Sequence, residues 1–259
     1  MEDYIFIVKI ILYFIVYSFF GWIMESVLKT VLQKKPVNSG FLYGPFCPIY
    51  GFGAIIMFIF LQGFKERPIL LFIIAFFVLS IWEYIVGWML EKIFHTKYWD
   101  YTENKFNIKG RVCLMNSLFW GFLGVVFIRY IHPFIVEKID IIKINDLLFL
   151  TITLLIIMIV DLVISIIKVK NITIKLEKLK EITTSIKEKI DELETKQINK
   201  ETLQLAIEDL KYKQTVIKGK LLKQTNRLKK AFPTMKSEAI ERINEFLKEK
   251  KENIRKGKN

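Results

Sequence analysis

The chain has 259 residues, 53% of them hydrophobic, with a mean hydropathy of +0.34 and a net charge of +13. That apolar share exceeds the share in a typical soluble domain, which argues against a soluble globular protein. The sequence contains two cysteines, Cys47 and Cys113, so neither a disulfide framework nor a thiolate zinc site is expected.

The apolar residues are gathered in blocks, and a block of roughly 20 such residues can cross a bilayer core. Five blocks qualify or nearly qualify, the second being the shortest. They are about Ile5–Leu28, Pro48–Phe64, Ile69–Leu90, Val112–Ile131 and Leu147–Ile167. The predicted fold is therefore all-α: a polytopic membrane protein with five transmembrane helices, followed by a C-terminal cytoplasmic helical or coiled-coil region. The chain opens without a basic leader, so we expect the first span to be retained.

Basic residues are concentrated near the C-terminus, where residues 169–259 hold 24 Lys and Arg against 14 Asp and Glu. The positive-inside rule places such a segment in the cytoplasm, beside an anionic leaflet. Five spans then put the N-terminus outside the cell. We therefore expect a multi-pass protein of the cell membrane, with residues 1–168 as its transmembrane domain and residues 169–259 as a basic cytoplasmic region. Nucleic-acid binding is disfavoured because acidic residues are interleaved with the basic ones.

Similar motifs recur in the same order in two halves of the apolar region. Gly21-Trp22-Ile23-Met24-Glu25 closes the first span, and Gly87-Trp88-Met89-Leu90-Glu91 closes the third. Tyr50-Gly51-Phe52-Gly53 is likewise matched by Trp120-Gly121-Phe122-Leu123-Gly124. The pattern predicts a duplicated hairpin, over about 5–64 and 69–131, with the fifth span at 147–167 left unmatched. Parallel repeats of this kind surround substrate sites in many transporters, whereas chance recurrence of glycine and aromatic residues is the alternative.

The segment NSGFLYGPFCPIYGFG, residues 38–53, is too apolar for a solvent loop and too broken for a helix. Non-helical backbone at membrane depth is tolerated only where it is buried in protein or lines water. The segment predicts a short re-entrant plug at the cytoplasmic mouth, with Tyr43, Cys47 and Tyr50 near a binding chamber. A rigid capping loop is the alternative.

Acidic residues within or at the ends of spans fall toward the cytoplasmic side in this topology: Glu25, Glu83, Glu91 and Asp161. Such residues usually face the protein interior or a water-filled cavity. Asn116 enters at the same level, and Arg111 lies at the mouth of the fourth span. The pattern predicts a polar chamber open to the cytoplasm. The alternative is that each acid pairs with Arg111, a tyrosine or a backbone group and only locks the helices.

The second predicted cytoplasmic loop, residues 95–111, reads HTKYWDYTENKFNIKGR. Its aromatic run suits the headgroup belt, and its Asp and Asn residues either bind a ligand or form caps and turns. The candidate substrate-binding residues are Glu25, Asn38, Tyr43, Cys47, Tyr50, Glu83, Glu91, Trp99, Asp100, Tyr101, Asn107, Arg111, Asn116 and Asp161. No catalytic residue, metal site or cofactor is expected.

The stretches GWIMES, NSGFLYGPFCPIYGFGA and KYWDYTENKFNIKGRVCLMNSLFWG, with His132-Pro133, together resemble a bacterial integral membrane family. That family carries the label putative ABC-transporter permease, type IV, and the resemblance covers roughly Val16 to Asp161. It implies a transport permease. The chain has no phosphate-cradling G-x-x-x-x-G-K-[ST] motif, so an ATPase that drives such a permease would be a separate polypeptide.

Beyond Asn171, apolar residues recur at helical spacing in two runs whose phases differ by three residues. Such a shift indicates either two helices joined by a turn near Thr195–Thr202 or one rod with a stammer. We favour the antiparallel pair of helices. Pro233 ends the second run. A third, basic helix is predicted around Ile240, Ile243, Phe246 and Leu247, where it could lie on the membrane or bind a partner.

Three functions fit these features. The first is a permease-like transporter subunit, whose partners would be membrane lipids, a separate ATPase, and a second copy or another coiled-coil chain. The second is a membrane-anchored adaptor that recruits a cytoplasmic partner through its coiled coil. The third is a membrane enzyme acting on lipid. It is disfavoured because the two histidines, His95 and His132, fall on opposite sides of the bilayer and no nucleophile–base motif is visible.

Overall fold

The computed structural model of this chain describes residues 2–195 and 200–237. Over these residues the fold is all-α, apart from two short strands that pair with each other. The helices are α1 (Glu2–Gln33), α2 (Pro48–Leu61) with the 3₁₀ turn η1 (Gln62–Phe64), α3 (Pro68–Phe94), α4 (Leu114–Val126), the π-helical turn η2 (Phe127–Ile131), α5 (His132–Asp140), α6 (Ile144–Thr195) and α7 (Lys200–Ala231). The strands β1 (Thr96–Lys97) and β2 (Lys236–Ser237) are antiparallel.

Within the described residues, four helical segments are long and apolar enough to cross a membrane, judged by length and composition. They are Asp3–Gln33, Pro68–Phe94, Leu114–Asp140 and Ile144–Ile186. The second predicted span is the shorter apolar helix Pro48–Phe64, which has the predicted bounds, and the chain just before Pro48 is not helical. At about 1.5 Å per residue it reaches about 25 Å, so a fifth crossing stays a prediction.

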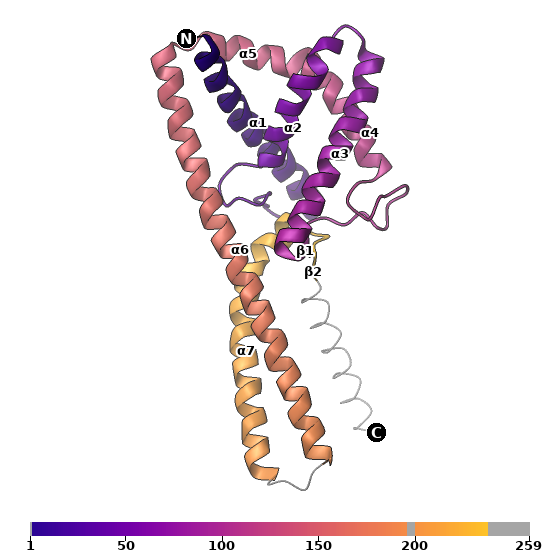
Figure 1. The fold of residues 1–259 in the computed structure, drawn as a ribbon, viewed down its shortest axis with the longest axis vertical. Coiled ribbons are helices and arrows are strands. Elements are labelled where there is room, and N and C mark those ends of the chain that lie inside the picture. Colours follow the sequence, from indigo (N-terminus) through magenta and orange to yellow (C-terminus); the bar gives the residue numbers. More distant parts are fainter. Residues whose placement is uncertain (1, 196–199, 238–259) are drawn as a thin grey trace.

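The fourth span is longer than predicted. Its helix passes through the π-helical turn η2, which ends at Ile131, and continues into α5. Pro133 lies in the first turn of α5, where it lacks an N–H to donate. Figure 1 shows α5 crossing the end of the bundle that carries the N-terminus. There Lys9 of α1 contacts Asp140 at 2.6 Å.

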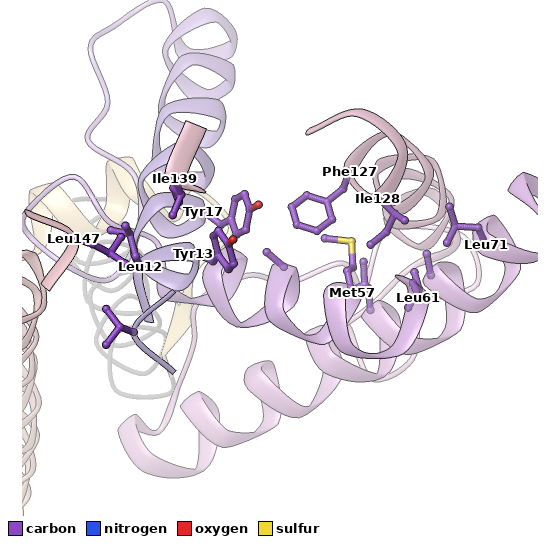
Figure 2. Close-up of a cluster of buried hydrophobic side chains, with 14 residues drawn as sticks. Leu12, Tyr13, Tyr17, Met57, Leu61, Leu71, Phe127, Ile128, Ile139 and Leu147 are labelled. Carbon is purple, nitrogen blue, oxygen red and sulfur yellow. The ribbon is translucent and has the colours of Figure 1, made fainter. Parts of the chain in front are cut away.

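The helices of the bundle alternate in direction (Figure 1). α1 and α3 run from the N-terminal end toward the tail, and α2 and α4 return. α1 packs mainly on α2, and α3 mainly on α4. Figure 2 shows where the two pairs meet: Tyr17 of α1 and Met57 of α2 lie near Phe127 of η2, which follows α4.

The tail is an antiparallel helical hairpin. α6 runs without a break from the membrane bundle through residue 168 to Thr195, and α7 returns along it (Figure 1). Leu176 and Leu179 of α6 pack with Leu221 and Leu228 of α7. The antiparallel pair of helices, favoured over a continuous rod, is therefore what the structure shows. The predicted third helix around Ile240 to Leu247 lies outside the described residues.

Candidate functional site

The predicted site residues fall into separate groups at the tail-facing end of the bundle. One surrounds Glu83, a second joins Glu91 to Arg111, and a third holds the segment between α1 and α2. We call residues 34–47 loop 1 and residues 95–113 loop 2. Each of the four predicted carboxylates has a partner among the described residues, so none of them projects alone into an open chamber.

Glu83 of α3 joins both loop 2 and α4. Its carboxylate accepts hydrogen bonds from the Tyr101 hydroxyl at 3.3 Å, from Asn116 Nδ2 at 3.2 Å and from Trp120 Nε1 at 2.9 Å. The residue is 4% exposed. All three donors are neutral, and no salt bridge to Glu83 occurs within residues 2–195 and 200–237. Glu83 and Asn116 thus lie close together, as predicted, and Tyr101 also contacts Glu83.

Arg111 fastens loop 2 to α3. Its Nε and Nη2 donate to Glu91 Oε2 at 3.0 and 2.7 Å, and its Nη1 donates to the Tyr84 hydroxyl at 3.0 Å. The Trp99 indole donates to the Arg111 carbonyl at 2.9 Å. A paired arginine of this kind fixes geometry at the membrane edge and leaves little free positive charge.

The remaining polar residues of loop 2 form its turns. Asn107 Nδ2 donates to the Thr102 and Asn104 carbonyls, and its Oδ1 accepts from the Gly110 N–H. Asp100 accepts from Thr102 and forms an ion pair with Lys236 at 2.5 Å. Burial raises the pKa of the Asp100 carboxyl, but the bonds from Lys236 and Thr102 outweigh it and hold that pKa below its usual value. Asp100 and Asn107 therefore take part in the turns of loop 2, which was one of the two roles considered for them.

Loop 1 is held by side chains from α1 and α6. Asp161 of α6 accepts the backbone N–H groups of Tyr43 at 3.1 Å and Gly44 at 2.7 Å. Asn38 donates to the Tyr43 carbonyl and accepts from the Trp22 indole. These bonds supply partners that a non-helical segment at the membrane edge cannot draw from lipid.

The Cys47 region closes the inner end of α1. The Cys47 N–H donates to the Ser18 carbonyl at 2.9 Å, which seats the start of α2 against α1. The Cys47 thiol donates to Glu25 at 3.4 Å, and Glu25 also pairs with Lys29 at 2.6 Å. The Tyr50 ring packs against Trp120, which donates to Glu83, with the ring centres 5.8 Å apart.

The end of α7 reaches the same place from the tail. Arg227 donates to the Leu42 carbonyl at 2.6 Å and to the Phe41 carbonyl at 2.8 Å, and its guanidinium lies 4.0 Å from the centre of the Tyr43 ring. Burial lowers the pKa of this guanidinium from its ordinary value. Lys29 also donates to the Ala231 carbonyl. Residues of α1, α6 and α7 therefore all form hydrogen bonds with loop 1.

Replacing Arg227 with alanine should loosen loop 1 and expose Cys47, whose thiol is buried. Hydrogen bonds to a charged donor contribute about 1.5–3 kcal/mol each, so we expect labelling of Cys47 by N-ethylmaleimide to speed up by about tenfold or more. The rate is measured in a Cys113→Ser background. Lys229→Ala, an exposed change on the same helix, should leave it unaltered. Equal rates in both variants would show that Arg227 does not hold the loop.

A cavity of about 690 Å³ lies where the two helix pairs meet, with walls from α1, α2, α3 and the α4–α5 segment. Its lining is apolar and rich in aromatic rings, among them Phe20, Tyr50, Trp82, Trp120, Phe127 and Tyr130. A second cavity, of about 680 Å³, lies beside loop 2 and is polar, with Lys92, Lys97, Arg111 and Lys236 in its wall. Among the described residues, no cluster of His, Cys, Asp or Glu could hold a metal ion.

Several residues of these sites were not foreseen from the sequence. Arg227 is one arginine in a basic tail, and nothing in its neighbours marks it. Trp120 occupies the position in the second repeat that Tyr50 occupies in the first, so the repeat could have identified it as a site residue. Tyr17 and His132, joined by a 2.7 Å hydrogen bond in the bundle core, were overlooked because a lone histidine in an apolar helix carries no pattern.

Four long apolar helices and a buried polar network define a multi-pass α-helical membrane protein. The sequence profile of the family described as putative ABC-transporter type IV matches residues 12–166, and the chain belongs to this family. The match ends where α6 leaves the bundle, so the tail hairpin lies outside it. No curated protein and no solved structure matches the chain.

Proposed function

We infer that the chain is the membrane-spanning, permease-like subunit of a transporter and that any ATPase is a separate polypeptide. The observation that carries this proposal is the cavity of about 690 Å³ between the two helix pairs. Its size lies within the range of small-molecule sites, about 300–1,000 Å³. The cavity is the proposed substrate passage, and the Glu83 group forms the polar part of the passage toward the cytoplasm. No catalytic role is proposed.

We further propose that the two helix pairs are duplicated hairpins and that α2 completes five crossings, with the N-terminus outside and the tail in the cytoplasm. Matched positions of the two halves support the duplication. Tyr50 and Trp120 meet with ring centres 5.8 Å apart. An added Cβ would lie 2.6 Å from the Phe14 carbonyl oxygen at Gly51, and 2.7 Å from the Phe72 ring at Gly121. Each glycine thus lets its helix approach the partner within its own hairpin.

The adaptor function is the second candidate, because the α6–α7 hairpin projects well beyond the bundle (Figure 1). Deleting residues 169–259 separates the two functions. An adaptor then loses its activity, whereas a permease retains substrate binding in the bundle.

Filling the cavity should block substrate binding. A Cβ added at Gly53 would make only ordinary contacts, 3.8 Å from Leu79 and Trp82 in the cavity wall, so Gly53→Leu places its side chain in the cavity. We expect saturable binding of the neutral probe N-phenyl-1-naphthylamine to the purified protein, weakened by about tenfold or more in this variant.

Gly63→Leu is the matched control, because nothing lies within 4 Å of a Cβ added there. Purification from native membranes in a mild detergent tests the other half of the proposal, since an ATPase should accompany the wild-type chain. Unchanged probe binding in Gly53→Leu would exclude the cavity as the passage.

A further inference from the structure

The inner end of the apolar cavity is bordered by a buried carboxylate. Trp120 lines the cavity with its ring, while its indole N–H donates to Glu83 at 2.9 Å. Glu83 therefore lies directly behind the aromatic wall. This arrangement places a source of negative charge one side chain away from an otherwise apolar space.

The charge of Glu83 lacks a cationic partner among the residues that the structure describes, since its three hydrogen-bond donors are neutral. Two basic groups of the same inner region are already paired elsewhere: Lys29 with Glu25 at 2.6 Å, and Arg111 with Glu91 at 2.7 Å. A carboxylate at membrane depth is costly, and either a bound proton or a nearby positive charge removes that cost. The inner end of the cavity consequently favours a cation and disfavours an anion.

The rings at this end suit a cation that carries apolar groups. Tyr50, Trp82 and Trp120 all line the cavity, and the centres of Tyr50 and Trp120 are 5.8 Å apart. Aromatic faces attract cations through their quadrupoles, most strongly where water is excluded, and groups of such faces recognise quaternary ammonium ions. The Trp82 N–H is occupied by the Ile49 carbonyl at 3.1 Å, so this ring has no need of a polar partner from a ligand.

We propose that the cavity binds lipophilic cations, with apolar substituents along its aromatic wall and the positive centre beside Trp120, in the field of Glu83. This assignment rests on the proposed function, because it names the substrate class of the same passage. A quaternary ammonium or phosphonium ion with large apolar groups is the expected ligand.

Tetraphenylphosphonium and tetraphenylborate test the proposal, because they have nearly the same shape and opposite charges. In equilibrium binding to the purified full chain, we expect the cation to bind more tightly than the anion by about tenfold or more. Glu83→Gln keeps the size of the side chain and removes its charge. It should abolish this preference. Glu137→Gln, an exposed change in α5, should retain the preference.

Equal binding of the two ions by the wild type, or a preference that survives Glu83→Gln, would overturn the assignment of a cationic ligand. The passage itself would still stand if the neutral probe binds and Gly53→Leu blocks it. Loss of neutral-probe binding in Glu83→Gln would show that the carboxylate only maintains the packing, which also contradicts the proposal. The outcomes thus separate the ligand class from the proposed function.

Discussion

Replacing Asp161 with alanine is expected to release loop 1 and to lower the stability of the whole bundle. Asp161 accepts the backbone N–H groups of Tyr43 and Gly44. The Tyr43 N–H also donates to Ser165 Oγ at 3.2 Å, so the Gly44 N–H is the donor that would lose its acceptor. A buried donor left without a partner costs about 1–3 kcal/mol, and lipid supplies no replacement. We therefore expect a loss of about 1–3 kcal/mol, seen as a lower midpoint of thermal unfolding in detergent and faster labelling of Cys47.

Asp209→Ala is the matched control, because Asp209 pairs with Lys213 on the exposed surface of α7. Exposed pairs of this kind contribute about 0.3–0.5 kcal/mol, so the unfolding midpoint should hardly move. Asp161→Asn should fall between the two, since it retains one acceptor oxygen and presents an N–H₂ where the second acceptor stood. If Asp161→Ala melts like Asp209→Ala, loop 1 is not held by this carboxylate.

Asp161 shows which features of the site could be predicted from the sequence and which could not. Its depth in the last span follows from counting residues, and the cost of a buried acid predicts that it needs partners. The partners are backbone N–H groups of a loop more than a hundred residues earlier, at sequence separations of 117 and 118. Backbone donors carry no sequence signal, so the predicted chamber placed Asp161 with Glu25 and Glu83, whereas its contacts are with loop 1.

Helix positions were easier to predict from the sequence, because a helix that crosses the bilayer must have a minimum apolar length. The second apolar block has the bounds predicted for it, Pro48–Phe64. The exception is the fourth helix, which continues through the π-helical turn η2 and past Pro133 to Asp140. Glu83 and Asn116 were placed at one level by counting along α3 and α4, and they do meet.

In the tail, likewise, the helices could be predicted from the sequence but an individual side-chain contact could not. The phase shift in the apolar pattern allowed either a hairpin or a single rod with a stammer, and the polar residues of Thr195–Thr202 favoured a turn between two helices. The contact of α7 with loop 1 could not be foreseen in this way. It depends on Arg227 reaching two carbonyl groups, those of Phe41 and Leu42, and the tail around it is rich in basic residues.

Introducing alanine at Gly124 is expected to drive α3 and α4 apart. An added Cβ would collide with the Cβ of Ala75, a fully buried residue of the facing helix. Overpacking of a tight core costs about 1–3 kcal/mol, and two rigid helices cannot relax at a contact between their Cβ atoms. The thermal unfolding midpoint of Gly124→Ala in detergent should therefore fall clearly below that of Gly63→Ala, where the added Cβ has open space.

Ala75→Gly offers a direct test of that cause. Once the Ala75 methyl group is removed, the nearest atoms to the new Cβ are Leu61 Cδ2 at 3.6 Å and the residue 75 Cα at 3.8 Å, both ordinary contacts. The double variant Gly124→Ala/Ala75→Gly should recover most of the stability lost by Gly124→Ala, with a coupling energy of about 0.5–3 kcal/mol. Additive losses in the double variant would show that the two residues do not face each other. Recovery would establish that α3 and α4 pack directly against each other at these two residues.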